Sequence, residues 1–435
     1  MIVRGLEEPI SLGGAVRAAS RCRLPCALLF GDAALCPRVM IAVDPVRVVR
    51  GDDVDELACA WAEQRAGWRA GDRPGVPAAA GFLSYDLGRR FERIRGAHLS
   101  PAPWPLVEFR FYGALLAFYP GTGRAEVWAR DEPAARRLLA DMRIPPEGAA
   151  SEAGAARPGA LTEMEPARAH LAAVARALEY IRAGDIYQVN LARRLSCALP
   201  TPPGRAPGAA LFLRLQSAAP APYAFWLADG ESGTALVGNS PERFLREHVD
   251  HTVETSPIKG TRPRTTAGSA RDAAALLASE KDRAEHVMIV DLERNDLGRV
   301  CRTGSVRVAE LCRVLALPTV VHLESTVRGE LRPEVGLPAL LRATFPGGSI
   351  TGAPKIRAME IIEELEPARR GPYTGATGWL GAGGDFDLAV AIRTALVRDS
   401  RLTLWVGGGI VADSAPEAEL AETWDKAEAF SRALG

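Results

Sequence analysis

Segments of helical periodicity alternate with short strand-like runs over the last two thirds of the chain, and this alternation limits the fold more than any other feature. Apolar residues recur at helical spacing over residues 167–183, and Gly184 is placed to end that helix. Further helices are predicted within residues 271–296, at 338–343, after Pro354 and over 416–434. Strands are predicted at residues 185–191, 225–227, 235–238, 375–380, 388–397 and 402–406. The pattern indicates a large α/β or α+β domain with no convincing internal repeat.

The first third of the chain has a different character and carries no catalytic constellation. Strand-like runs and part of a helix are predicted there at residues 26–30, 107–112 and 133–139. Residues 145–166 are rich in Ala, Gly, Pro and Glu and offer little to bury, so they are the best candidate for a domain boundary or linker. We therefore predict an N-terminal region over residues 1–150 and a catalytic core over residues 165–435.

Charge and cysteine content exclude several classes of protein. The 435 residues include 53 Lys plus Arg and 53 Asp plus Glu, and this balance argues against a nucleic-acid or anionic-membrane partner held by bulk charge. The sequence shows no signal peptide and no apolar run long enough to span a bilayer. The seven cysteines lack CxxC spacing. They are typical of reduced thiols in a cytoplasmic protein.

Lysine is scarce, and one lysine lies in a conspicuous motif. Only Lys259, Lys281, Lys355 and Lys426 occur, while the other 49 basic residues are arginine. Lys259 is the centre of the stretch ETSPIKGTRPR, residues 254–264. A desolvated lysine can lose its proton and act as a nucleophile or base, which arginine cannot. Burial and neighbouring cations such as Arg262 are expected to lower its pKa. The alternative is a surface lysine in a turn.

Two helices carry pairs of acids at turn spacing. Asp282 and Glu285 are three residues apart, as are Glu419 and Glu422, so each pair shares a helix face. Carboxylates that face each other from two helices make an oxygen-rich site for Mg²⁺, which takes part of its shell from waters and an anionic substrate. From spacing alone, two solvated faces neutralised by adjacent lysines remain the simpler interpretation.

Two glycine-rich segments follow strands or precede helices. Residues 347–355 precede a helix, and their backbone N–H groups could hold a phosphate or carboxylate. They do not form a P-loop, because Ala353-Pro354 separates Lys355 from the last glycine. Residues 407–409 allow a ligand to approach the backbone closely. Tyr373 and Arg393 could add a hydroxyl and a guanidinium fork for one carboxylate.

Taken together and in this order, these segments resemble the chorismate-utilising enzyme family from about Ala167 to the C-terminus. The motifs that carry the resemblance are DIYQVNL (185–191), SPERF (240–244), PIKGT (257–261), EKDRAEHVMIVDLERNDLGRV (280–300), HLES (322–325), GGSITGAPK (347–355), YTGA (373–376), AIRT (391–394), GGGIVADS (407–414) and AETWDKA (421–427). The resemblance implies an α+β fold in which two large antiparallel β-sheets pack together, with helices outside and the site between the sheets.

The resemblance also implies a role for individual residues. It implies Mg²⁺ bound by Glu285 and Glu422 with Glu419 beside them. It implies substrate contacts from Tyr373, Arg393, Gly408 and Gly352. It implies that Lys259, Glu242, His322 and Thr351 form the catalytic group, with Glu242 as the acid that protonates the departing hydroxyl.

Two positions indicate which reaction is performed. Family members that add water to chorismate usually carry a lysine base where this chain has Gln188, and anthranilate synthases usually read PIAGT where Lys259 occurs here. The lysine form is similar to the aminodeoxychorismate synthase component I subfamily, which aminates chorismate at C4 on the 4-aminobenzoate and folate route. Anthranilate synthase component I is the main alternative. A non-catalytic subunit that binds chorismate or tryptophan is another, although every expected acid is present.

The remaining expectations concern partners and an effector. No cysteine lies in a glycine-flanked nucleophile elbow, so we expect a separate glutamine amidotransferase subunit to supply ammonia and a separate pyridoxal-phosphate lyase to complete 4-aminobenzoate. In anthranilate synthase large subunits an LLES-like segment contributes to a tryptophan site. The comparable stretch here is LLFG, residues 28–31, and it does not match that segment.

Overall fold

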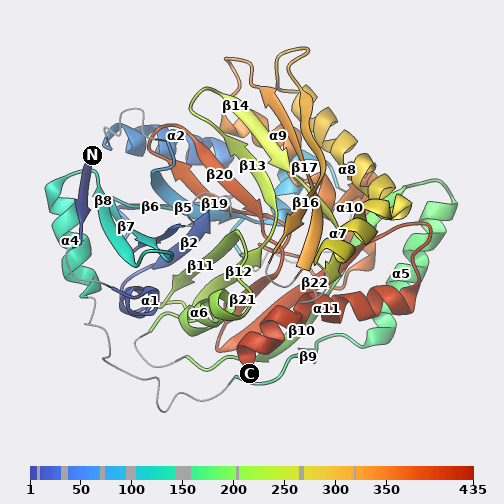
Figure 1. Cartoon of the computed structure of the whole chain (residues 1–435), viewed down its shortest axis with the longest axis horizontal. Helices are drawn as coiled ribbons and strands as arrows, with labels where there is room; N and C mark the ends of the chain where they lie inside the picture. Colours follow the sequence, from blue (N-terminus) through green and yellow to red (C-terminus); the bar gives the residue numbers. More distant parts are fainter. Residues whose placement is uncertain are drawn as a thin grey trace.

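The computed structural model describes residues 1–6, 10–30, 38–68, 74–94, 104–143, 158–201, 205–263, 269–317 and 320–435. Its strands form two large antiparallel sheets that pack face to face, and helices cover the outside of both (Figure 1). This is the α+β sandwich that the resemblance implies.

The first sheet has twelve described strands, and its longest, β22 and β10, lie next to each other near one edge. In spatial order they are β1 (Ile2–Gly5), β8 (Arg124–Ala129), β7 (Ala114–Tyr119), β3 (Arg38–Ala42), β2 (Cys26–Phe30), β11 (Tyr223–Asp229), β12 (Thr234–Ser240), β21 (Thr394–Arg398), β22 (Arg401–Ile410), β10 (Gln188–Ala198) and β18 (Gly352–Ala353), with β9 (Thr162–Glu163) beside β10.

The second sheet has ten described strands. In spatial order they are β15 (Ile258–Pro263), β17 (Val320–Glu330), β14 (Thr252–Ser256), β13 (Arg243–Glu247), β20 (Phe386–Val390), β19 (Ala376–Gly381), β5 (Pro77–Leu83), β6 (Val107–Phe111) and β4 (Arg47–Gly51), with β16 (Arg307–Ala316) also paired to β17.

The helices lie outside the sandwich. They are α1 (Leu12–Ala19), α2 (Val54–Ala66), α3 (Gly88–Phe91), α4 (Glu132–Met142), α5 (Ala167–Arg182), α6 (Ala209–Ala218), α7 (Ser269–Ala278), α8 (Glu280–Gly298), α9 (Leu337–Thr344), α10 (Lys355–Leu365) and α11 (Pro416–Leu434), with short 3-10 turns at η1 (Tyr85–Leu87) and η2 (Gly348–Ile350).

Three apolar clusters match these layers. Between the sheets, Leu28 and Phe225 of the first sheet share a cluster with Phe82 of the second. Ala27, the neighbour of Leu28, points the other way into a cluster that includes Phe430 of α11. A third cluster joins the outer face of the second sheet to α8, α9 and α10. Because both faces of these strands are covered, a strand such as β2 reads as an uninterrupted apolar run.

Residues 1–143 complete both sheets of the core rather than forming layers of their own. β2 pairs with β11, with Leu28 opposite Phe225, and β5 pairs with β19, with Gly81 opposite Gly378. The predicted linker lies largely outside the described residues, because only its last part, from residue 158 on, is described. Each sheet therefore contains strands from both sides of the boundary predicted at about residue 150.

Most predicted elements are confirmed, including the helix at 416–434 and the paired strands at 225–227 and 235–238. The strand predicted at 185–191 begins only at Gln188 and continues to Ala198. The region at 271–296 holds two helices, because the hydroxyl of Ser279 accepts the N–H of Asp282 at 3.2 Å and starts α8 as a new helix.

The prediction of one strand over residues 388–397 is wrong in a way that matters for the site. β20 ends at Val390 and β21 begins at Thr394. Between them, Arg393 has a φ of 49°, in the left-handed region, which an extended strand does not tolerate. The break turns the Arg393 side chain away from the strand pattern.

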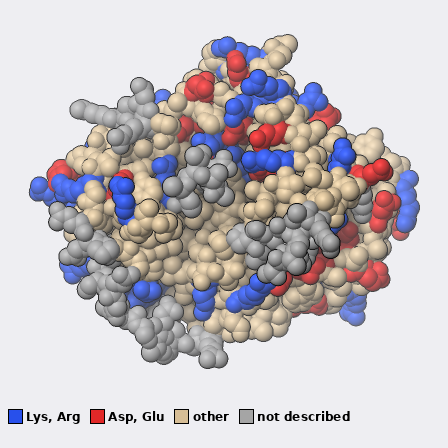
Figure 2. Space-filling view, in the orientation of Figure 1, with Lys and Arg blue, Asp and Glu red and all other residues tan. Residues whose placement is uncertain are grey.

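Basic and acidic side chains lie among one another on the face shown in Figure 2, as expected from equal numbers of each sign. In the part of the chain that the structure describes, no helix has both the length and the apolar character needed to cross a membrane.

Candidate active site

Lys259 lies where the two sheets meet. It belongs to β15 of the second sheet, opposite Leu323 of β17, and its Nζ reaches Gly409 in β22 of the first sheet. A Cβ at Gly409 would lie 2.8 Å from Nζ of Lys259 and 3.2 Å from Nε2 of Gln188. A side chain at 409 would therefore crowd both groups, and glycine leaves room for the end of Lys259 and the amide of Gln188 beside the strand.

Burial lowers the pKa of Lys259 below its ordinary value. The carboxylates of Glu285, Glu242 and Glu422 oppose this by favouring the charged form, while the cation Lys426 adds to the decrease. The lysine therefore lies among three acids and one other base. A lysine with a lowered pKa supplies more neutral amine, which is the nucleophilic form.

The cation beside Lys259 differs from the one that the sequence suggested. Arg262 forms an ion pair with Asp282 at 2.7 Å, and Lys426 of α11 is the neighbouring cation that lowers the pKa of Lys259. The expectation of Arg262 in this role is therefore corrected. Strand alternation offered no means of seeing that α11, at the far end of the chain, contributes the cation.

Glu242 is a buried carboxyl group between β12 and β13. Its pKa is raised to about 7, first by burial and also by the charge of Glu293, while a hydrogen bond from Ser349 and the charge of Lys259 oppose the increase. The Ser349 hydroxyl donates to Oε1 of Glu242 at 2.5 Å. A carboxyl group with this pKa still carries its proton near neutrality and can donate it to a leaving group.

Arg393 and His322 form a second part of the site. Nη2 of Arg393 lies 3.3 Å from Nε2 of His322, and Nδ1 of His322 lies 3.1 Å from the carbonyl oxygen of Gly260. The carbonyl can only accept, so Nδ1 carries the proton and Nε2 accepts from Arg393. Burial and the charge of Arg393 lower the pKa of His322 to about 3, so the imidazole is neutral.

The guanidinium group of Arg393 is itself buried. Burial lowers its pKa to about 10, and the charge of Glu242 opposes the decrease. A buried cation whose hydrogen bond goes to a neutral imidazole is poorly compensated, and an anion placed beside it would be strongly favoured. This position suits a carboxylate of a ligand.

The acids predicted to hold a metal come from two helices. Glu285 of α8 and Glu422 of α11 both act on the ammonium group of Lys259. Oε1 of Glu422 also forms an ion pair with Nζ of Lys426 at 2.7 Å. Glu422 is thus neutralised by an adjacent lysine, as the simpler interpretation of the acid pairs expects. The same carboxylate nevertheless acts on Lys259 together with Glu285.

Glycine at 408 opens space beside these acids. A Cβ at Gly408 would lie 3.2 Å from Oε2 of Glu419 and 3.6 Å from Oε1 of Glu422. Oε1 of Glu419 accepts the hydroxyl of Ser414 at 2.6 Å. Gly408 therefore borders the carboxylates, whereas the adjacent Gly409 borders Lys259, because successive residues of a strand face opposite ways.

The acidic groups near Lys259 supply carboxylate oxygen, the ligand type that Mg²⁺ takes from proteins. Among the described side chains, no group of three or more His, Cys, Asp or Glu residues is arranged to hold a metal. Mg²⁺ is commonly held by one or two carboxylates, with waters and an anionic substrate completing its shell. Glu285 and Glu422 are carboxylates of this kind, and the magnesium site that the sequence suggests at them stays a prediction.

Gln188 places an amide in the site, at the position where the sequence analysis expects no lysine base. Both its amide oxygen and nitrogen are buried, and neither has a hydrogen-bond partner among the residues described. The Oδ1 of Asn190, two residues along the same strand, is in the same state. Buried polar groups are normally paired, so these atoms mark a place where a polar ligand would bind.

Thr351 and Gly352 hold the backbone of the site. The hydroxyl of Thr351 donates to the carbonyl of Gly347 at 2.9 Å, and its own carbonyl accepts the N–H of Asn190 at 2.8 Å. Gly352 has a φ of 143°, and a Cβ there would lie 2.1 Å from the carbonyl oxygen of Gln188. In this structure both residues attach the glycine-rich segment to β10.

Tyr373 lies against aromatic and cationic side chains. Its ring stacks on Trp405 with centroids 5.6 Å apart and planes 10° apart, and the Arg370 guanidinium lies 5.9 Å from its centroid. Burial raises the pKa of Tyr373 above its ordinary value, so the hydroxyl keeps its proton. It is therefore a hydrogen-bond donor and not a base.

The glycine-rich segment does bind a carboxylate through its backbone, but that carboxylate belongs to the chain itself. The N–H of Gly348 donates to Oε1 of Glu293 at 2.9 Å. The phosphate or carboxylate that the sequence predicted for this segment is thus replaced, at Gly348, by a side chain of α8. Pro354 precedes the first residue of α10 as its N-cap.

Residues that sequence reasoning missed include Ser349 and Glu293. One signal was available for Glu293. The buried face of α8 includes Ile289, Val290 and Leu297, and Glu293 interrupts this apolar stripe. A charged residue on the buried face of a helix needs a partner, which here is the backbone of the glycine-rich segment.

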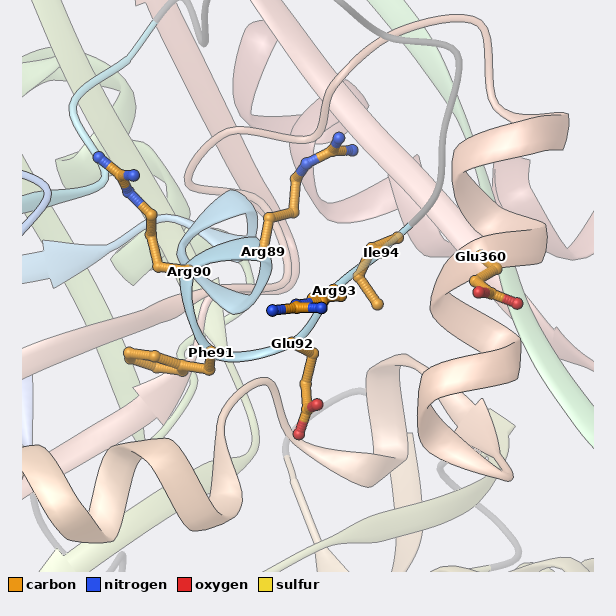
Figure 3. A pocket seen from close by; sticks show the side chains of 7 residues that line it. All are labelled: Arg89, Arg90, Phe91, Glu92, Arg93, Ile94 and Glu360. Carbon is orange, nitrogen blue, oxygen red and sulfur yellow. The ribbon is translucent and has the colours of Figure 1, made fainter.

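A separate pocket lies on the outside of the sandwich, between the turn after α3 and Glu360 of α10 (Figure 3). Its volume is about 810 Å³, and three of its lining residues are arginines. Arg89 is ion-paired with Glu363 at 2.5 Å, and Arg90 with Asp52. None of the predicted site residues lines this pocket.

Comparison with known proteins agrees with the geometry. The model of the chorismate binding enzyme family matches residues 25–432. Anthranilate synthase component 1 of Streptomyces coelicolor is 41% identical over 386 residues, which cover 83% of this chain and 74% of that protein. Aminodeoxychorismate synthase component 1 of Klebsiella aerogenes is 40% identical over 356 residues, covering 81% and 76%. The solved structure of anthranilate synthase component I from Streptococcus pneumoniae TIGR4 has a TM-score of 0.77 at 28% identity, covering 93% of this chain and 94% of that one.

Proposed function

Because this chain belongs to the chorismate binding enzyme family, we propose that it replaces the C4 hydroxyl of chorismate with an amino group and so forms 4-amino-4-deoxychorismate on the 4-aminobenzoate and folate route. At the coarser level, it is a chorismate-utilising enzyme of the anthranilate and aminodeoxychorismate synthase type. The proposal concerns which of these reactions the site performs.

The observation that carries the proposal is the place of Lys259. Its amine is buried beside Gln188 and Gly409, and its pKa is lowered by that burial. Glu242, a carboxyl group that holds its proton to about pH 7, acts on the same amine from another segment. A nucleophile and an acid that lie close together can attack an allylic system and protonate its leaving group.

The reaction proceeds in two displacements. The neutral amine of Lys259 attacks the ring carbon at the far end of the allylic system, the double bond shifts, and the C4 hydroxyl leaves as water with the proton of Glu242. Ammonia then attacks C4, the double bond returns, and the carbon–nitrogen bond to Lys259 breaks. Two accessible steps thus replace one hindered displacement.

The charged groups of the site suit the two carboxylates of chorismate. The buried guanidinium of Arg393 and the hydroxyl of Tyr373 would hold one carboxylate. Glu285 and Glu422, with Glu419 beside them, would hold Mg²⁺. When bound, Mg²⁺ neutralises and orients the other carboxylate. His322 stays neutral and keeps Arg393 directed into the site.

Anthranilate synthase component I is the second candidate. It is favoured by similarity as strong as that to the aminating enzymes, at 41% against 40% identity. In that reaction ammonia adds at C2 and pyruvate is lost. A lysine at 259 is what separates the two proposals, because it can occupy the ring position that ammonia would otherwise attack.

Product analysis tests the proposed function. Chorismate, Mg²⁺ and an ammonium salt are incubated with the protein, and products are followed by liquid chromatography with mass detection and by a pyruvate assay. We expect a product that retains the enolpyruvyl group and carries nitrogen in place of one hydroxyl. Anthranilate with one equivalent of pyruvate would support the second candidate instead, and no conversion would contradict both.

Ammonia is expected to come from a partner subunit. The relatives bear the name component 1, which implies a second component. We propose that this partner is a glutamine amidotransferase, so glutamine should replace ammonium salts only when that subunit is added.

Removing either predicted metal ligand should weaken Mg²⁺ binding. We expect Glu285→Gln and Glu422→Gln each to raise the dissociation constant for Mg²⁺ roughly tenfold or more, since a neutral amide is a poorer ligand for a hard cation. Isothermal titration with Mg²⁺ in the presence of chorismate measures the change. Glu428→Gln, on the same helix but ion-paired with Arg432, is the control. Unchanged titration in both variants would remove the assignment.

Water should not replace ammonia as the nucleophile. The Gln188 amide has no basic form near neutral pH, so nothing at that position can activate water. We expect no isochorismate when chorismate and Mg²⁺ are supplied and ammonia is withheld. Chromatography against an isochorismate standard added to a parallel sample measures this, and a steady isochorismate yield contradicts the assignment.

A further inference from the structure

Glu293 is a buried carboxyl group that the proposed reaction does not use. It lies on the inner face of α8, two turns after Glu285, and its side chain accepts the N–H of Gly348 at 2.9 Å. The segment that it holds begins the turn η2 and continues directly into Ser349.

Gly348 lies close to two side chains of α8. A Cβ at Gly348 would lie 2.5 Å from Cδ2 of Leu292 and 3.2 Å from Oε1 of Glu293. The backbone of Gly348 therefore lies close against side chains of α8, and a larger residue would not fit there without a shift. Ser349, the next residue, points its hydroxyl at Glu242, 2.5 Å from Oε1. Two adjacent residues, Gly348 and Ser349, thus connect the two carboxyl groups along this path.

Charged groups surround Glu242 from several elements. Glu293 of α8 is a like charge that favours the protonated carboxyl, whereas Lys259 of β15 favours the ionised form. Arg393, in the turn before β21, also acts on Glu242. The Ser349 hydroxyl and the N–H of Ile258 complete the surroundings by hydrogen bonding to the carboxylate. Of these groups, Glu293 is the one whose charge keeps the proton in place.

Glu293 has its own neighbours. Asp296, on the next turn of α8, is a like charge, and Lys355 of α10 is an opposite charge. Nζ of Lys355 is hydrogen-bonded to Asp296 and to the carbonyl of Thr344 at 3.0 Å, and so is held toward Asp296. Burial raises the pKa of Glu293 above its ordinary value, and the Gly348 N–H opposes the increase.

We propose that Glu293 is a positioning residue for the acid Glu242: it fixes the Ser349 hydroxyl on Glu242 by holding the backbone of Gly348, and its carboxylate acts on Glu242 as a like charge. The proposal rests on the proposed function only for the use that Glu242 makes of its proton. The arrangement itself is a property of the folded chain and can be tested without any substrate.

The pH dependence of stability follows from the raised pKa values. An acid whose pKa is higher in the folded than in the unfolded protein stabilises fully below the unfolded value, and this stabilisation is lost as pH rises through the folded value. For Glu242 the loss falls between about pH 4.5 and 7. Glu242→Gln removes this loss, so the variant should gain stability over wild type as pH rises.

Two variants separate charge from hydrogen bonding. Glu293→Gln keeps an oxygen for the Gly348 N–H but removes the charge, so Glu242 should titrate about one pH unit lower. Ser349→Ala keeps Glu293 but removes the hydroxyl that favours the ionised form, so Glu242 should titrate higher. The two substitutions thus move one titration in opposite directions, which loosened packing alone would not do.

The experiment is a cycle of urea unfolding curves between pH 4.5 and 8.5 for wild type, Glu242→Gln, Glu293→Gln and the double variant. The free energy of unfolding that Glu242→Gln gains over its parent, plotted against pH, reports the titration of Glu242. Its midpoint should fall by about one unit in the Glu293→Gln background. Glu363→Gln, which removes a buried acid paired with Arg89, is the matched control and should leave the midpoint in place.

Kinetics provide the second readout. If the protein aminates chorismate, the pH at which kcat falls on the alkaline side should be lower in Glu293→Gln by the same amount. KM for chorismate should be unchanged. Glu293→Met, which also removes the acceptor, should lower kcat further. A midpoint that stays fixed in Glu293→Gln overturns the proposal whether or not the protein turns over chorismate. If Glu293→Gln does not fold, the Ser349→Ala variant is the test. A Glu242 titration midpoint that fails to rise in Ser349→Ala overturns the proposal, and a rise supports it.

Discussion

Lys259→Arg is expected to abolish amination of chorismate, lowering kcat roughly 10³-fold or more, as the loss of a covalent nucleophile does elsewhere. Arginine keeps the positive charge and most of the length, so electrostatic contacts with Glu285 and Glu422 persist. It cannot lose its proton, however, and so cannot attack the ring. A lysine that merely paired with a substrate carboxylate would tolerate the change.

A trapped intermediate gives the direct measurement. The wild-type protein is incubated with chorismate and Mg²⁺ without ammonia, and its intact mass is recorded. We expect an adduct that maps to Lys259 and is absent from Lys259→Ala. Lys355→Arg, which alters a lysine bonded to Asp296 outside the reacting group, should still form it. The covalent mechanism is wrong if no adduct can be trapped and Lys259→Arg aminates at the wild-type rate.

Arg370→Met is expected to lower the free energy of unfolding by roughly 3–5 kcal/mol. Arg370 is almost wholly buried and forms an ion pair with Glu366 at 2.6 Å. It also donates to the carbonyls of Asn190 at 2.8 Å and Ile350 at 3.0 Å. Methionine fills much of the space but leaves a buried carboxylate and two carbonyls without their donor. Urea unfolding at pH 7 measures the loss.

Two controls show whether the effect comes from the buried charge. Glu366→Gln added to Arg370→Met should recover part of the loss, because no uncompensated charge then remains buried. Arg432→Met breaks an exposed pair with Glu428 in α11 and should cost less than about 1 kcal/mol. Equal losses for Arg370→Met and Arg432→Met would show that Arg370 does not brace the site.

Arg370 also explains why a stability variant should affect the site. Its hydrogen bonds join the end of α10 to β10 beside Gln188 and to the turn that carries Ser349. Neither its neighbours nor its burial was foreseeable, because residues 366–370 carry no periodic pattern. The sequence analysis therefore missed the residue on which the backbone of the site depends.

Many helices and strands could be predicted from the sequence because their signals are local. The spacing of apolar residues and the caps predicted α5 and α11 to within a residue, and the short apolar run of β2 predicted that strand. The break at Arg393 was missed, since a left-handed φ at an arginine has no signal in the local sequence such as a glycine would give.

By itself, the sequence determined the family, through its ordered motifs, and the set of residue types available for chemistry. Local periodicity indicated a large α/β or α+β domain, and the two-sheet architecture followed only from the resemblance to the family. Only the tertiary structure decided which groups act on one another. Lys426 rather than Arg262 is the cation beside Lys259, and the glycine-rich segment binds Glu293. Burial and charge interactions depend on distances between segments remote in sequence, which no local pattern contains.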